Sequence, residues 1–243
     1  MENPDTGLNP ALQTKLTHSL ALLQHIAKEF SPAVFANSLG VEDMVLTDLI
    51  ARHHIAIDIF SLDTGRLPNE TYTLMQQAAE AYPAKPIKVF FPQAEAVETY
   101  VNTHGINGFY GSVDARKTCC HIRKLEPLAR ALAGKQAWIT GLRSEQSTTR
   151  TTMQEQEWDA TNGLQKFNPL LVWTEKEVWA YIKTYQVPYN ALHDQHYPSI
   201  GCAPCTRAIA VGEDIRAGRW WWESPENKEC GLHAKVSSLK PIK

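Results

Sequence analysis

The sequence predicts an α/β fold, a doubly wound and mostly parallel sheet with helices on both faces. Two observations predict it. Short, nearly continuous apolar runs recur through the first 140 residues, and stretches with apolar residues three and four positions apart separate them. Parallel strands are buried on both faces, so their sequences are apolar throughout instead of alternating. A content of 43% hydrophobic and 21% charged residues agrees with a globular protein.

The elements follow in order along the chain. Asn9-Pro10 is a helix-start signal, and a leucine stripe from Leu12 to Leu23 predicts a helix to about Glu29. The apolar runs predict strands at 33–36, 55–60, 87–91 and 137–140. Helices are expected at 44–52, 70–82, 121–132 and 173–185, the last capped by Thr174 with Glu177 as its reciprocal partner.

Charge and hydropathy exclude several classes of protein. The 24 Lys and Arg nearly balance the 26 Asp and Glu, for a net charge of −2, so a nucleic acid is not an expected partner. No apolar run approaches the roughly 18 residues that span a bilayer, and the first residues lack the features of a signal peptide. We therefore expect a cytoplasmic protein with no membrane partner.

Three polar loops follow predicted strands, at residues 37–43, 62–70 and 141–150. Ligands of open parallel sheets bind at the carboxyl ends of the strands, where these loops would meet. The loop 37–43 leads into a helix whose first N–H groups could hold a phosphate, although alone it also fits an ordinary glycine turn. It has neither the Walker nor the dinucleotide glycine pattern. Together, the three loops favour a phosphorylated ligand such as a nucleotide.

Five cysteines stand out in this composition: Cys119 and Cys120 are adjacent, Cys202 and Cys205 form a Cys-x-x-Cys pair, and Cys230 is alone. Two pairs of thiolates can hold one metal centre. Adjacent ligands suit a single tetrahedral zinc poorly, whereas a cubane cluster spreads its attachment points over separate irons. The spacing favours a [4Fe–4S] cluster and leaves zinc as the alternative.

Basic residues accompany the cysteines. Arg123 and Lys124 follow the first pair, where cations would offset the charge of a cluster. Cys230 has Arg216 and Arg219 upstream and His233 nearby, a setting that lowers a thiol pKa and favours nucleophilic attack. For the three tryptophans at 220–222, packing onto the domain is favoured over stacking on nucleic-acid bases.

Several motifs together resemble the iron–sulfur branch of the assimilatory adenylyl-sulfate and phosphoadenylyl-sulfate reductases. The resemblance runs from about residue 30 to 234, and the N-terminal loops resemble that family's phosphate loop (Ser38-x-Gly40-x-Glu42-Asp43) and nucleotide-side loop (Leu62-Asp63-Thr64-Gly65). The most specific motifs are Lys117-Thr118-Cys119-Cys120-His121-Ile122-Arg123-Lys124, Gly201-Cys202-Ala203-Pro204-Cys205-Thr206-Arg207, the segment 216–223 and Glu229-Cys230-Gly231-Leu232-His233. The resemblance implies an adenine nucleotide α-hydrolase-like fold of the PP-loop type.

The resemblance also implies an activity. It is the reduction of adenosine 5′-phosphosulfate (APS) to sulfite and AMP, in sulfate assimilation and cysteine biosynthesis. Cys230 would attack the sulfuryl sulfur to form an S-sulfocysteine, and reduced thioredoxin or glutaredoxin would release sulfite from it. A [4Fe–4S] cluster would be held by Cys119, Cys120, Cys202 and Cys205, and the family suggests a dimer or tetramer.

Site roles follow from the same resemblance. Lys124, Arg216 and Arg219 would surround the sulfate and α-phosphate, with His233 near the nucleophile. The remaining substrate-binding residues would be Ser38 and Gly40 at the phosphosulfate, Phe60 and Leu62 at the adenine, Gly141 and Arg150 at the ribose, and Arg123. We expect residues 1–205 to form the nucleotide-binding domain with the iron–sulfur site. Residues 206–243 would form the Arg/Trp segment and a mobile catalytic tail.

Two alternatives stay open. A phosphoadenylyl-sulfate (PAPS) reductase, or an enzyme that accepts both nucleotides, differs only in accepting a 3′-phosphate. A zinc-stabilised module that binds a nucleotide or RNA would have no reductase chemistry. An ATP pyrophosphatase or tRNA thiolation enzyme is disfavoured, because the Ser-Gly-Gly-x-Asp-Ser loop is absent at Ser38-Leu39-Gly40-Val41-Glu42-Asp43.

Overall fold

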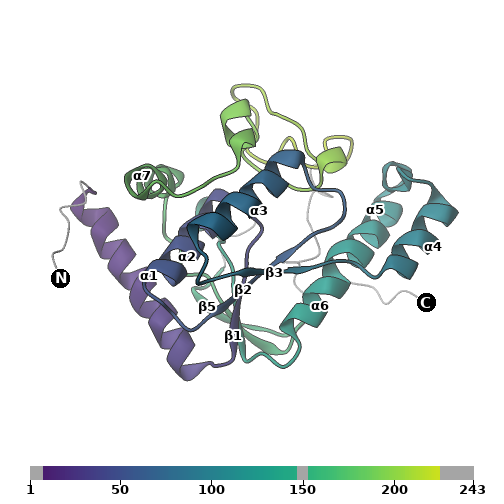
Figure 1. The fold of residues 1–243 in the computed structure, drawn as a ribbon. Coiled ribbons are helices and arrows are strands. Elements are labelled where there is room, and N and C mark those ends of the chain that lie inside the picture. Colours follow the sequence, from purple (N-terminus) through teal and green to yellow (C-terminus); the bar gives the residue numbers. More distant parts are fainter. Residues whose placement is uncertain (1–7, 147–152, 225–243) are drawn as a thin grey trace.

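The computed structural model describes residues 8–146 and 153–224 of the chain. This part contains a six-stranded sheet of order β3-β2-β1-β4-β6-β5, viewed nearly edge-on in Figure 1. Neighbouring strands are parallel except for β5, which pairs antiparallel with β6 at one edge. The strands are β1 (Ala33–Ala36), β2 (Asp58–Leu62), β3 (Ile87–Phe90), β4 (Ala137–Ile139), β5 (Gln156–Asp159) and β6 (Leu164–Phe167). The predicted mostly parallel α/β fold is confirmed.

Helices cover both faces of the sheet (Figure 1). One face carries the larger core, where alternate strand residues such as Phe35, Ile59 and Ile139 are buried beneath α1 (Pro10–Glu29), α2 (Val41–Arg52), α3 (Asn69–Ala81) and α7 (Glu175–Tyr185). On the other face Val34 and Trp138 pack with residues of α6 (Glu126–Leu132). α4 (Ala94–His104) and α5 (Val113–Cys120) lie on this second side (Figure 1).

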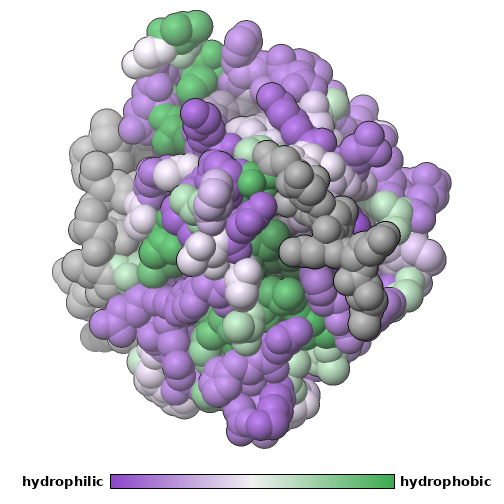
Figure 2. Space-filling view, turned by 90° about the vertical axis from the view of Figure 1, so that its left-hand side faces the viewer, coloured by the Kyte–Doolittle hydropathy of each residue, from purple (hydrophilic) through white to green (hydrophobic). Residues whose placement is uncertain are grey.

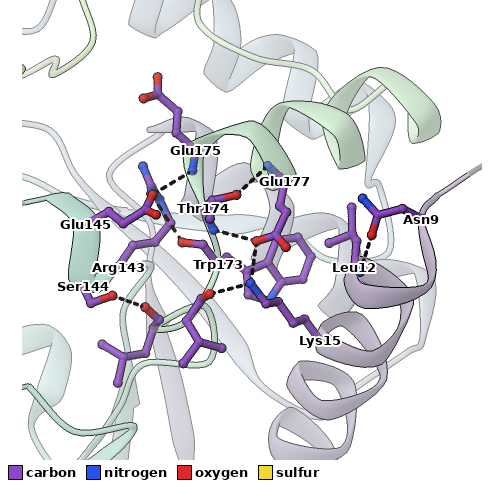
Figure 3. Close-up of polar contacts among 12 residues, drawn as sticks. Asn9, Leu12, Lys15, Arg143, Ser144, Glu145, Trp173, Thr174, Glu175 and Glu177 are labelled. Atoms are coloured by element: carbon purple, nitrogen blue, oxygen red, sulfur yellow. Dashed lines mark hydrogen bonds and ion pairs between the residues drawn. The ribbon is translucent and has the colours of Figure 1, made fainter.

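The N-terminal ends of α1 and α7 are capped as the sequence predicts (Figure 3). The Asn9 side chain accepts the Leu12 N–H at 2.9 Å. Thr174 and Glu177 form the reciprocal capping box, with the Thr174 N–H 2.7 Å from the Glu177 carboxylate. Lys15 then joins the two helices, because its ammonium lies 2.8 Å from the same carboxylate.

The region around Cys119 and Cys120 differs from the prediction. The pair does not precede a helix at 121–132; it ends α5, and the chain continues through a π-helical turn, η2 (His121–Leu125), into α6. Ser112 starts α5 early because its hydroxyl caps the Ala115 N–H at 3.0 Å. A π-helical turn within a helix is frequent at functional sites.

Two further differences have simple causes. The second strand begins at Asp58 instead of residue 55, since Ile55 and Ile57 are buried in the turn that leads into it. The hairpin of β5 and β6 was not predicted. Its edge strand, Gln156–Asp159, is polar and gives no apolar signal.

The surface on the side of α1 and α7 is mixed in character where the structure describes it (Figure 2). Figure 2 shows that side as mostly hydrophilic, with hydrophobic residues in small groups. Among the described residues, no helix combines the length and apolar character that crossing a membrane requires. Of the tryptophan tract, Trp220 is buried, which confirms the predicted packing for this residue, and Trp221 is partly exposed.

Candidate active site

A pocket opens at the carboxyl ends of β1, β2 and β4. β1 has β2 on one side and β4 on the other, and this reversal of strand order leaves a crevice in parallel sheets. The loops after β1 and β4, the first turn of α2 and η2 meet around it. Its lining includes five residues that the sequence analysis singled out: Ser38, Phe60, Leu62, Lys124 and Gly141.

The loop after β1 is held in a specific shape. Leu39 has a positive φ of 63°, which is uncommon for a residue with a side chain. Its N–H donates to the Asn37 side-chain oxygen at 2.6 Å, and the Asn37 amide donates to the Thr47 hydroxyl at 2.8 Å. Gly40 then forms the N-cap of α2 and has no side chain to bond the first N–H groups. Such a helix start attracts anions.

Gly141 lets the loop after β4 approach α2 closely. A Cβ atom at this position would lie 2.2 Å from the Asp43 carboxylate oxygen Oδ1, so no larger residue fits without movement. Arg143, two residues on, is buried, and its Nε donates to the Glu42 carboxylate at 2.8 Å. Figure 3 shows its guanidinium beside Glu145 and the Trp173 carbonyl. Arg143 therefore fixes this loop against α2 and the segment before α7.

Asp43 is a buried carboxyl group on the pocket wall. Its Oδ2 accepts both the N–H and the hydroxyl of Ser38, each at 2.6 Å. Burial raises the pKa of Asp43 to about 6, although the Ser38 hydrogen bonds act in the opposite direction, and the charge of Glu42 raises it further.

An apolar wall faces this polar end. Phe60 is buried, packs edge-to-face with Phe90 at 5.8 Å between ring centroids, and lines the pocket with Leu62 and Trp138. A flat aromatic base would bury its faces against such side chains. The pocket thus combines an apolar end with a helix start suited to a phosphate.

The four paired cysteines lie in one neighbourhood. Cys119 and Cys120 end α5, and Cys202 and Cys205 flank the short turn η6 (Ala203–Cys205). All four are partly buried, and none is in a disulfide bond within the part of the chain that the structure describes. Burial is the main cause that raises the pKa of Cys205, to about 12, and the neighbouring Cys202 and Cys120 raise it further. Cys202 likewise interacts electrostatically with Cys119.

The loop of the second pair is tied to the loop after β2. The Thr64 hydroxyl lies 3.2 Å from the Cys202 sulfur, and the Ala203 N–H donates to the Arg66 carbonyl at 2.8 Å. Within residues 8–146 and 153–224, no group of three or more His, Cys, Asp or Glu side chains is arranged to hold a metal ion. The ligand roles of the four cysteines stay a prediction.

The predicted cations occupy different places. Lys124 lines the pocket and also interacts electrostatically with Cys205, so it lies between the pocket and the thiols. Arg123 is buried outside the pocket lining, and its guanidinium donates to the Thr64 carbonyl at 2.6 Å. Its observed contacts are with the loop after β2 and with Cys119, and its substrate-binding role stays a prediction.

The two arginines of the C-terminal segment also differ from each other. The Arg219 guanidinium stacks on the Trp220 ring at 4.8 Å and donates to the Ile200 carbonyl at 3.1 Å. The next residue is Gly201, and a Cβ atom there would lie 2.4 Å from the Arg219 guanidinium. The backbone N–H of Arg216 donates to Asp214 at 2.8 Å. Their roles at the sulfate stay predictions. Three further predicted site residues, Arg150, Cys230 and His233, lie outside the described residues.

A buried ion pair that was not predicted from the sequence lies beside the cysteines. Arg116, on α5, is 1% exposed and donates to both carboxylate oxygens of Glu223, at 3.0 and 2.8 Å. It also stacks on Trp220 at 4.7 Å. No local pattern marks this pair, because its partners are 107 residues apart. Asp43, in contrast, stood in the quoted phosphate-loop motif, and the sequence analysis gave it no role of its own.

The parallel sheet, the switch-point pocket and the glycine-containing helix start define an α/β enzyme of the nucleotide-binding class. The family model of the phosphoadenosine phosphosulfate reductase domain matches residues 32–208. The chain belongs to this family, which confirms the resemblance found in the motifs.

Relatives and one solved structure agree with this assignment. The chain is 57% identical over 224 residues to the adenosine 5′-phosphosulfate reductase of Allochromatium vinosum, covering 92% of this chain and 87% of that protein. It is 53% identical over 237 residues to that of Burkholderia cepacia, covering 98% and 94%. The crystal structure of PAPS reductase from Candida auris in a phosphate complex is 26% identical, with a TM-score of 0.68, and covers 83% of this chain and 98% of that one.

Proposed function

We propose that the protein is an oxidoreductase that reduces adenosine 5′-phosphosulfate to sulfite and AMP. The observation that carries the proposal is a nucleotide-type pocket whose lining residue Lys124 also interacts with the cysteine neighbourhood. The high identity to relatives named adenosine 5′-phosphosulfate reductase, over nearly the whole chain, supports this substrate.

The reaction needs a nucleophile and a reductant. The Cys230 thiolate attacks the sulfuryl sulfur, the bond from that sulfur to the phosphate oxygen breaks, and AMP leaves. A thiolate of reduced thioredoxin or glutaredoxin then attacks the Cys230 sulfur and releases sulfite. The second thiol of that protein resolves the mixed disulfide, so the dithiol supplies both electrons.

The pocket residues bind and orient the nucleotide. Ser38 and the N-terminus of α2 hold the phosphosulfate, and Phe60 and Leu62 flank the adenine. Lys124, at the pocket wall, stabilises the charge that develops on the transferred group. Arg216, Arg219 and His233 assist at the same end, and Gly40, Gly141, Arg123 and Arg150 complete the binding site.

The donor chemistry of four neighbouring thiols suits an iron–sulfur cluster. Thiolates are the usual ligands of [4Fe–4S] centres, and Cys119, Cys120, Cys202 and Cys205 would hold one here. Arg123 and Lys124 interact electrostatically with Cys119 and Cys205 respectively, which suits a centre of net negative charge. When bound, the cluster would supply a fixed electrostatic field beside the sulfate.

Mass spectrometry after a single turnover tests the function. Cys230 should gain the mass of one SO₃ group, and the Cys230→Ser variant should bind APS without gaining it. The same adduct on the Cys230→Ser variant would refute the nucleophile. Anaerobically purified protein should contain iron, whereas stoichiometric zinc without iron would favour the binding module.

A PAPS reductase is the second candidate, favoured by the likeness to the Candida auris enzyme. Steady-state rates with APS and with PAPS, each with reduced thioredoxin, discriminate the two. We expect faster turnover of APS. We further propose that the protein acts in the cytoplasm, where thiols stay reduced. We also propose that it is a dimer or tetramer, and light scattering of the purified protein tests this oligomeric state.

A further inference from the structure

Two carboxylates stand at the end of the pocket where an anion is expected. Glu42 and Asp43 line it together with Ser38 and Lys124. Glu42 is compensated, because the buried Arg143 guanidinium donates to it at 2.8 Å. Asp43 is instead bonded to neutral groups, the N–H and hydroxyl of Ser38. It is therefore the less compensated negative charge at this end of the pocket.

The Asp43 carboxylate uses the donors that a phosphate would need. Both hydrogen bonds from Ser38 are 2.6 Å long, as expected for bonds to a charged acceptor. The other oxygen lies against the backbone at Gly141, where a Cβ would be only 2.2 Å away. This carboxylate thus occupies two donors of Ser38, just before the start of α2, that a bound anion could otherwise use.

A substrate anion and an ionised Asp43 oppose each other at this site. The phosphosulfate would compete for the Ser38 donors and would add negative charge beside a group that is only 7% exposed. Protonation of the carboxyl relieves both conflicts, because the neutral acid binds Ser38 more weakly and carries no charge. A pKa of about 6 for Asp43 makes the uptake of this proton accessible near neutral pH.

We propose that Asp43 is a positioning residue of the phosphate loop, which holds Ser38 in the ligand-free enzyme and takes up one proton from solvent as the nucleotide enters. The inference rests on the proposed function for the identity of the nucleotide. One proton moves from solvent to the carboxylate, and no covalent bond between heavy atoms changes. Ser38 is then released to donate to the substrate.

Other charged groups surround Asp43. Glu42 comes from the same helix, Arg143 reaches Glu42 from the loop after β4, and Lys124 comes from η2. His193, in η5 (Ala191–Gln195), interacts with Glu42, and burial lowers its pKa. His193 is a second titratable side chain near this carboxylate pair, so it provides the matched control.

Isothermal titration calorimetry measures the proton directly. APS is titrated into anaerobically purified Cys230→Ser holoenzyme near pH 7, in buffers of different ionisation enthalpy. Neither the phosphate nor the sulfate of APS titrates in this range. We expect uptake close to one proton and a Kd that weakens up to about tenfold per pH unit above pH 6.

Two variants assign the proton. Asp43→Asn should abolish the uptake and the pH dependence of Kd, whereas His193→Gln should retain both. Uptake that persists in Asp43→Asn, or that disappears in His193→Gln alone, would overturn the assignment. Should Asp43→Asn not fold, as judged by circular dichroism, the parent protein still decides, because binding without proton uptake refutes the inference. Failure to bind APS at all would instead refute the proposed function.

Discussion

The buried Arg116–Glu223 ion pair joins the helix that ends in Cys119 and Cys120 to the last described segment of the chain. Both side chains are almost inaccessible, at 1% and 4% exposed, and the two hydrogen bonds are 3.0 and 2.8 Å long. Removing one partner of such a pair leaves a buried charge uncompensated, which costs about 3–5 kcal/mol.

Two single variants separate the contributions. Glu223→Gln keeps the shape of the side chain and removes its charge, so we expect a loss of about 3 kcal/mol in the free energy of unfolding. Arg116→Met also loses the stacking on Trp220, at 4.7 Å, which adds about 1 kcal/mol. The double variant Arg116→Met/Glu223→Leu should recover most of the loss, because no charge stays buried.

Anaerobic urea unfolding, followed by tryptophan fluorescence and circular dichroism, measures these changes. The matched control is Arg207–Glu213, a second bidentate pair of the same segment, with bonds of 2.9 Å and side chains 39% and 35% exposed. Arg207→Met should cost much less than either buried single variant, because water screens an exposed ion pair. Equal losses at the two pairs would refute the reasoning that burial decides the magnitude.

Three further predictions concern buried contacts. Gly141→Ala should weaken AMP binding at least about tenfold by calorimetry, because its Cβ would lie 2.2 Å from Asp43; an unchanged Kd contradicts this. Asp48→Ala should lower the free energy of unfolding by about 1–3 kcal/mol, because the buried Tyr181 hydroxyl, which donates to Asp48 at 2.7 Å, loses its acceptor. An unchanged urea midpoint would contradict this prediction. Because its pKa is raised to about 6, Asp43 binds more protons in the folded state than in the unfolded state. Its contribution to stability is present below about pH 4 and is lost, by about 3 kcal/mol, as pH rises through 6. Urea unfolding across this range should show that slope in the parent and a flatter one in Asp43→Asn; parallel slopes contradict it.

Four of the six strands of the sheet and most of the helices could be predicted from local patterns. Buried parallel strands are apolar throughout, and the caps at Asn9 and Thr174 are encoded within four residues of the bonds they make. The polar edge strand β5 and the early start of α5 escaped prediction. In both, the hydrophobic period is too weak to mark the element, and pairing or capping decides it.

The sequence by itself determined the family, the fold class and five of the residues that line the pocket, because these depend on short motifs and on strand ends. The tertiary structure decided which charges are compensated. Arg143 reaches Glu42 across 101 residues, and Arg116 reaches Glu223 across 107. The close approach of Gly141 to Asp43 likewise joins two residues that are far apart in the sequence. Such contacts depend on how separate elements pack, and burial makes each of them strong, so no local pattern of residues can reveal them.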